Sequence, residues 1–370
     1  MIPIALPSAS FFILLTAGFF AGLLLLGWGV ALAASGRARR TVRKYWKTSI
    51  VLCLALAAPF SFYAWFQAVM WQVGRDIDRK QAALRVTLQE PAVVGGVAMP
   101  AGTRLTLKDE GKLDTYVEAS FPQAVPMLGV QATSARRYLD TEYEAQTYAT
   151  LGRHPRTVIL RGAGVQTVQG WGCDGAQDIE FAVEPDGAMK AFEQCVLAPG
   201  NEAAGLAIAA GTALRGSSGT VYTDGSRDAD RWRLEVESEA AVPLYGLFLS
   251  RPTLYLDASR NVLRVTDAEL ACRTQFGGLT YPAGTQFKTA RRGAGEDREP
   301  YPGVLVFSPW NGQAAVRPGH EDVPEGMSVM HTPQGEFIKT VSNDAAGVFR
   351  FDTFVVDGKE PARPARARCP

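Results

Sequence analysis

The chain has few of the residues and motifs on which most enzyme chemistry depends. It has three histidines in 370 residues, His154, His320 and His331, and they are far apart in the sequence. It contains no Cys-x-x-Cys pair, no Gly-x-Ser-x-Gly nucleophile elbow and no glycine-rich phosphate-binding loop. These absences argue against a zinc site and against serine hydrolase or nucleotide chemistry. We therefore expect a protein that is not an enzyme and that binds no cofactor or metal ion.

Acidic residues are absent from the first 71 positions, although the whole chain has 37 of them. Within this region the runs 11–34 and 50–71 contain no charged side chain. Each run has about the 20 residues that a helix needs to cross a membrane. The segment 36–47 between them carries six arginines and lysines. We predict that residues 1–71 form a transmembrane helical hairpin with a basic loop at 36–47.

The basic loop predicts the orientation of this hairpin, because loops rich in arginine and lysine stay in the cytoplasm. Both termini and residues 72–370 then lie outside, in the periplasm of a bacterial cell. A cleaved signal peptide is the alternative for the first run, but residues 1–10 lack the arginine or lysine with which such a peptide begins. We expect an inner-membrane protein with two spans.

The outer part changes character along the sequence. Residues 72–90 are interpreted as a spacer helix that continues the second span. Residues 91–358 alternate apolar and polar side chains, as in Thr103–Leu107, which is typical of strands with one buried face. The predicted class of this domain is all-β. Residues 359–370 are rich in proline and arginine and are predicted to be a flexible tail.

A ten-residue frame recurs in the β-rich part: glycine, apolar, small, apolar, proline or alanine, then Ala-Gly-Thr, any residue and an apolar one. Strong copies start at Gly96, Gly205 and Gly278. Weaker copies start at Gly129, Gly164 and Gly246. Their period of about 36 residues lies within the range of repeat architectures. We predict stacked strand-turn-strand repeats, as in a β-solenoid or rolled sheet. A β-sandwich with similar hairpins is the alternative.

Four of the five cysteines lie in the outer part, where an oxidising compartment favours disulfide bonds. Cys173 and Cys195 flank two short strand patterns joined by a Pro-Asp-Gly turn, and we predict that they pair. The sequence leaves open whether Cys272 pairs with Cys369. Cys53 lies in the second apolar run and is interpreted as a small apolar side chain.

The segment 134–150 interrupts the repeat pattern and is interpreted as a helix or an exposed loop. Its tyrosines, Tyr138, Tyr143 and Tyr148, are the candidate binding surface. The alternative is that they cover the adjacent sheet.

Carboxylates at Asp174, Asp178 and Glu180 lie close in sequence to Trp171. Such a group could flank a sugar, as the acid pair of a glycosidase does. We favour the interpretation that they belong to a solvated strand face, because acidic residues beside turns are common.

Taken together, these features predict a binding module rather than a catalyst. Beyond residue 71 the chain has 32 basic against 37 acidic residues, so we expect no nucleic-acid partner. The partners we expect are membrane lipid around the two spans and a protein in the periplasm. One form of this function is an immunity protein that neutralises a toxin at the envelope. The alternatives are an assembly scaffold of an envelope complex and a periplasmic glycan hydrolase.

Overall fold

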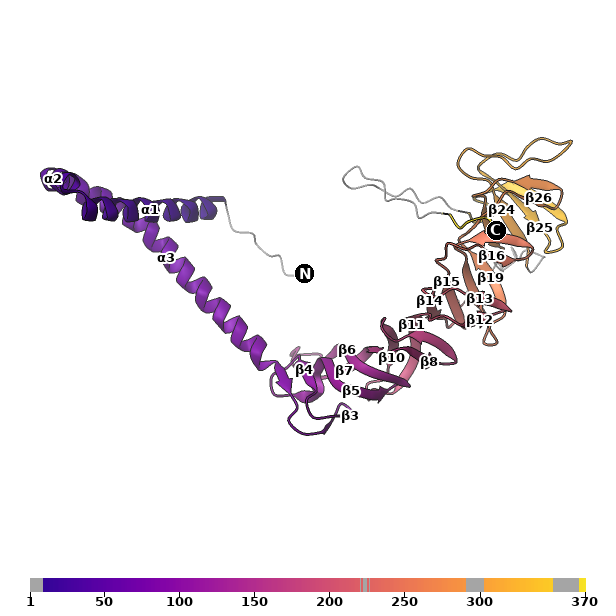
Figure 1. Ribbon diagram of the computed structural model, residues 1–370, viewed down its shortest axis with the longest axis horizontal. Coiled ribbons are helices and arrows are strands. Elements are labelled where there is room, and N and C mark those ends of the chain that lie inside the picture. The colour runs from indigo at the N-terminus through magenta and orange to yellow at the C-terminus, as the bar shows by residue number, and fades with distance from the viewer. Residues whose placement is uncertain (1–8, 220, 222–224, 226, 291–302, 349–365) are drawn as a thin grey trace. The chain divides into compact units, whose positions relative to one another are not determined.

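The computed structural model describes residues 9–219, 221, 225, 227–290, 303–348 and 366–370 (Figure 1). The chain divides into two compact units, Met1–Arg85 and Val86–Pro370. The first is helical, and the second is mostly β-strand in several antiparallel sheets.

The helical unit contains α1 (Ala9–Ala34), α2 (Gly36–Lys44) and α3 (Trp46–Ala83). Helices α1 and α3 are long and apolar enough to cross a membrane. They pack closely at Gly18, where a Cβ atom would lie 2.5 Å from the Pro59 carbonyl oxygen. The rings of Phe11 and Phe66 meet edge to face beside this contact, with centroids 5.4 Å apart. Small residues at such a crossing let two apolar helices approach each other.

Two expectations about this region need correction. The basic segment 36–47 is not an open loop, because α2 occupies most of it; the Ser35 hydroxyl accepts a hydrogen bond from the Ala38 amide and caps its start. The spacer helix does not reach residue 90. Helix α3 continues through 72–83, where alanine, glutamine, lysine and arginine favour helix. The β-branched pair Val86-Thr87 then belongs to strand β1 (Arg85–Thr87).

The β unit is built on an 11-stranded antiparallel sheet. In spatial order its strands are β1, β4 (Arg104–Leu107), β5 (Tyr116–Met127), β6 (Val130–Tyr143), β7 (Thr150–Gly162), β10 (Ile179–Val183), β11 (Met189–Val196), β14 (Ala213–Gly216), β15 (Trp232–Glu235), β18 (Thr253–Leu256) and β19 (Val262–Thr266). A 3₁₀ turn, η1 (Leu113–Thr115), precedes β5. The order follows the sequence, and the numbers that are skipped belong to hairpins inserted between neighbouring strands.

A second antiparallel sheet has seven strands. Its strands are β16 (Val242–Leu244), β17 (Leu247–Ser250), β20 (Ala268–Leu270), β23 (Gln286–Thr289), β24 (Leu305–Ser308), β25 (Met327–His331) and β26 (Phe337–Ser342). Four two-stranded pairs complete the unit: β2 (Ala92–Val94) with β3 (Val97–Met99), β8 (Val165–Val168) with β9 (Trp171–Asp174), β12 (Asn201–Ala203) with β13 (Leu206–Ile208), and β21 (Thr274–Phe276) with β22 (Leu279–Tyr281).

One face of the 11-stranded sheet is apolar and buried. The residues that lie opposite one another across its strands form two rows, Leu105, Ala119, Ala135, Leu160 and Ile179, and then Cys195, Leu214, Leu234, Leu254 and Val265. All of them are buried. Burying a leucine side chain contributes about 1.5–3 kcal/mol, so these rows supply much of the drive to form the sheet.

The inserted hairpins lie on this apolar face. Trp171 of β9 is fully buried and meets Trp232 of β15 edge to face, with ring centroids 5.9 Å apart. Cys173 of the same strand is disulfide-bonded to Cys195 of β11. The next hairpin is joined to this one by Asn201, whose side chain both accepts from the Gly172 amide and donates to its carbonyl, at 2.9 and 2.8 Å.

The sequence repeat corresponds to a repeat of tight hairpin turns. Among the described residues, six two-residue turns that join paired strands have positive φ at both central residues, as type I′ turns require: Gly95-Gly96, Leu128-Gly129, Gln169-Gly170, Ala204-Gly205, Tyr245-Gly246 and Gly277-Gly278. Their second residues are 33, 41, 35, 41 and 32 positions apart. Five of the six predicted starts are therefore turn glycines. The start predicted at Gly164 is wrong, because the turn of that hairpin lies six residues later.

The Ala-Gly-Thr part of the strong copies closes each unit in the same way. The amides of Leu88, Leu197 and Leu270 donate to the carbonyls of Thr103, Thr212 and Thr285, at 2.9, 2.8 and 2.9 Å. The glycine before each threonine donates back to the same leucine, at 2.7, 2.9 and 2.8 Å. All three threonines are completely buried. The Gly-Thr pair of each strong copy thus hydrogen-bonds in both directions to a leucine earlier in the chain and buries its threonine. We call this arrangement the strand-closing motif.

The last five residues are held against the β unit rather than free. Cys369 is disulfide-bonded to Cys272, Ala367 is buried, and its amide donates to the Ser250 hydroxyl at 2.9 Å. This differs from the flexible tail that we expected over 359–370, since composition does not reveal a distant cysteine partner. Residues 359–365 lie outside the described part of the chain.

Removing the Cys173–Cys195 bond should weaken the β unit. The bond joins positions with a sequence separation of 22, and losing such a link costs about 2–4 kcal/mol. We expect C173A/C195A to lower the free energy of unfolding by this amount in urea titrations of the full chain under non-reducing conditions. C53A is the control, because Cys53 forms no disulfide. An unchanged double variant would contradict the expectation.

Two neighbouring glycines of one turn should respond differently to alanine. A Cβ at Gly277 would lie 2.3 Å from the His331 ring and 2.5 Å from the Gly335 carbonyl oxygen, whereas a Cβ at Gly278 meets nothing within 4 Å. Both have positive φ, so G278A should cost about 1 kcal/mol from backbone strain alone. G277A adds a clash and should cost more than about 3 kcal/mol. Equal melting temperatures for the two variants would refute this account.

Candidate functional site

The segment 134–150, interpreted from sequence as a helix or loop, is the end of a long β-hairpin. Strand β6 continues to Tyr143 and β7 begins at Thr150, with Asp140 opposite His154. The interpretation was wrong because the apolar-polar alternation disappears where neither face of a strand is buried. This stretch is exposed along most of its length.

The end of this hairpin extends beyond the neighbouring strands. The pairing of β5 with β6 begins at Glu118 opposite Arg136, and the pairing of β10 with β7 ends at Ala182 opposite Thr157. Among the described strands, residues 138–143 therefore pair only with β7, and residues 150–156 pair only with β6. We call residues 138–156 the arm.

The arm presents three tyrosines to solvent. Tyr138, Tyr143 and Tyr148 are 49%, 57% and 79% exposed, and Leu151 beside them is 62% exposed. At the tip, the Tyr148 amide donates to the Glu144 carbonyl at 2.9 Å. The side chains singled out from the sequence thus share one projecting element and are largely free of the sheet.

An ion pair fixes the base of the arm. Arg153 Nε donates to Asp109 Oδ2 at 3.0 Å, and Arg153 Nη1 donates to the Thr141 hydroxyl at 2.6 Å. The hydrogen bond from Arg153 lowers the pKa of the Asp109 carboxyl. Because Asp109 lies in the connection between β4 and η1, this pair joins the arm to the main sheet.

Two of the three carboxylates near Trp171 are held by neighbouring side chains. Asp178 accepts from Arg136 at 3.1 Å and from Arg161 at 2.5 Å, and Glu180 accepts from Gln194 at 2.8 Å. Trp171 is completely buried, because it belongs to the core face of its hairpin. No tryptophan face is therefore available here for stacking on a sugar ring.

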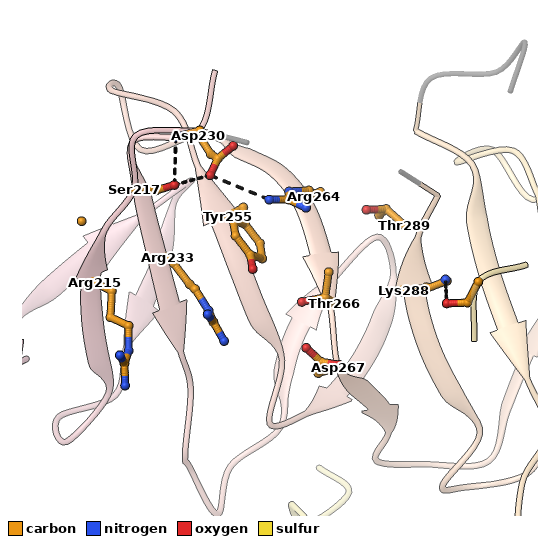
Figure 2. A pocket seen from close by; sticks show the side chains of 13 residues that line it. Arg215, Ser217, Asp230, Arg233, Tyr255, Arg264, Thr266, Asp267, Lys288 and Thr289 are labelled. Atoms are coloured by element: carbon orange, nitrogen blue, oxygen red, sulfur yellow. Dashed lines mark hydrogen bonds and ion pairs between the residues drawn. The ribbon is translucent and has the colours of Figure 1, made fainter. Parts of the chain in front are cut away.

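A cavity of about 600 Å³ opens on the polar face of the 11-stranded sheet (Figure 2). A row of side chains lies directly opposite one another on four adjacent strands there: Arg215, Arg233, Tyr255 and Arg264. The Arg264 guanidinium stacks on the Tyr255 ring at 3.6 Å from its centroid. Alternation predicts that each of these positions is polar, but the sequence holds no signal for the cross-strand register that brings them together.

The three histidines do not come together. His154 lies in the arm, His320 is exposed, and His331 is completely buried on β25. His331 Nε2 hydrogen-bonds the Tyr281 hydroxyl at 2.6 Å, and the rings of Phe276 and Phe307 surround it at 5.4 and 5.5 Å. Burial lowers the pKa of His331 and raises that of Tyr281.

Within the described residues, no group of three or more histidine, cysteine, aspartate or glutamate side chains could hold a metal ion. No family model, curated protein or solved structure matches the chain. Its function must therefore be inferred from the two long apolar helices, the arm and the polar face.

The buried histidine predicts a pH dependence of stability. Because the folded-state pKa of His331 is lowered, the unfolded chain binds a proton first as pH falls through about 6.5. The stabilisation is therefore complete above this value and decreases toward pH 5, by about 1.4 kcal/mol for each unit of pKa difference. Urea titrations at pH 5 and 7.5 should show the decrease, and H331Q should reduce it. H320Q, at an exposed position, is the control, and an equal slope in H331Q would contradict the assignment.

Proposed function

We propose that the protein is a membrane-anchored module that binds another protein outside the membrane. The observation that carries the proposal is the arm, an element that extends beyond the neighbouring strands and whose three tyrosines are 49–79% exposed. Tyrosine is enriched among the residues that dominate protein interfaces, because it combines a large apolar area with a hydroxyl and few rotatable bonds.

The anchor supports the location in this proposal. Helices α1 and α3 are long and apolar enough to span a membrane, and the connecting α2 carries only basic charges. A cytoplasmic α2 would leave the β unit outside, in the periplasm of a bacterial cell. Two disulfides in the β unit agree with an oxidising compartment.

The repeated hairpins support a finer interpretation of the fold, in which successive units stack as a β-repeat. Stacked repeats present extended surfaces, which suit recognition of a protein better than the deep pocket of a catalyst. The partner class we propose is a protein that reaches the outer side of the membrane. In the immunity form of this function, that protein is a toxin directed at the envelope.

Photo-crosslinking from the arm tests the proposal. A benzophenone amino acid at Tyr148 of the full chain in cells should yield a discrete crosslinked protein, whereas the same group at Val165, which is also exposed at 60%, should not. Replacing Tyr143 and Leu151 by serine should reduce the crosslink about tenfold or more, since an interface anchor is worth at least about 2 kcal/mol.

Because the replaced side chains are exposed, the serine variant should melt close to the unaltered protein. Identical crosslinks from Tyr148 and Val165, or a crosslink that survives the serine substitutions, would contradict binding by the arm.

A further inference from the structure

The cavity on the polar face is rich in hydrogen-bond donors. Four basic side chains line it, Arg215, Arg233, Arg264 and Lys288, against two carboxylates, Asp230 and Asp267. Figure 2 shows the arginines extending from neighbouring strands, with Lys288 on β23 across the opening. The cavity thus lies between the polar face of the 11-stranded sheet and strand β23 of the seven-stranded sheet.

Most of the guanidinium donors in this cavity have no acceptor among the residues that the structure describes. Arg215 and Arg233 share one oxygen, Glu235 Oε1, at 3.4 and 2.9 Å. Arg233 Nε is buried without a hydrogen-bond partner among the described residues. The carboxylate oxygens nearest Arg264, on Asp228 and Asp230, are both 3.8 Å away, which is too far for a hydrogen bond. Three guanidinium groups carry about 15 N–H donors, and few of them are used.

Two of the nearby carboxylates are partly engaged by other groups. Asp230 Oδ2 accepts from the Ser217 hydroxyl at 2.5 Å and faces Arg264, whereas its Oδ1 is buried without a hydrogen-bond partner among the described residues. Glu235 is shared by two arginines. Arg264 itself is held in place by stacking on Tyr255, and its side chain is 16% exposed. The guanidinium groups of Arg215, Arg233 and Arg264 therefore keep N–H donors that no described acceptor takes up, and a ligand with several lone pairs could accept from them.

We infer that this cavity binds a compact oxyanion, a phosphate or carboxylate group, between Arg264 on one side and Arg215 and Arg233 on the other. Planar guanidinium groups match both anions, because they donate two parallel hydrogen bonds to a pair of oxygens. This site lies on a different element from the arm and stands independently of the proposed protein partner.

Calorimetric titration tests the site on the full chain in a non-ionic detergent, at constant ionic strength in chloride. Inorganic phosphate and succinate are the two probes, and their relative affinities distinguish a phosphate from a carboxylate ligand. We expect saturable binding of at least one probe and a loss of about tenfold or more in R264Q, since each charge-assisted bond to an anion contributes substantially.

Two further variants keep the test decisive. R215Q/R233Q changes side chains that are 49% and 39% exposed, against 16% for Arg264, and should fold even if R264Q does not; it should weaken binding to a similar degree. R136Q is the matched control, because Arg136 lies on the main sheet outside the cavity and pairs with Asp178. Absence of saturable binding by either probe, or binding that is equal in R215Q/R233Q and R136Q, would overturn the inference.

Discussion

The β unit depends on the need to cover the apolar face of its long sheet. An antiparallel sheet of 11 strands presents a broad surface of leucine, valine and alanine that water would otherwise contact. The chain covers it locally, by inserting a short hairpin before many of the sheet strands. Trp171 and the Cys173–Cys195 bond show how one hairpin is fixed to the strands beneath it. The repeat units that carry such a hairpin thus bring both a part of the sheet and a part of its cover.

This construction explains why the repeat is visible in the sequence and yet irregular. The turn needs positive φ at two residues, and the strand-closing motif needs a glycine and a buried threonine, so these positions recur. The lengths of the strands between them are less constrained, which is why spacing varies from 32 to 41 residues. In the copy at Thr212 an alanine replaces proline, and the threonine hydroxyl has no hydrogen-bond partner among the described residues.

The covered face leaves the opposite one for contacts with other molecules. The polar side chains on this face form cross-strand pairs. Those of Arg215, Arg233 and Arg264 line the cavity described above. The arm differs, since it extends past the sheet and both of its faces are exposed. The apolar side of the sheet strands thus supplies stability, whereas the anion site that we propose lies on the opposite side of the same strands, as the alternation of side chains along a strand allows.

The sequence by itself determined the two apolar helices, the β class of the remainder, five of the six glycines at which the repeat copies start and the pairing partner favoured for Cys173, because each depends on local pattern or composition. It did not predict the arm, because apolar and polar side chains do not alternate along a strand that is exposed to solvent on both faces. It could not reveal that Cys369 returns to Cys272, nor that Arg215, Arg233 and Arg264 lie in one row. Those features depend on strand register and on contacts between distant segments. Only the tertiary structure decided them, because the free energy that selects one register comes from burying the whole apolar face of the sheet at once.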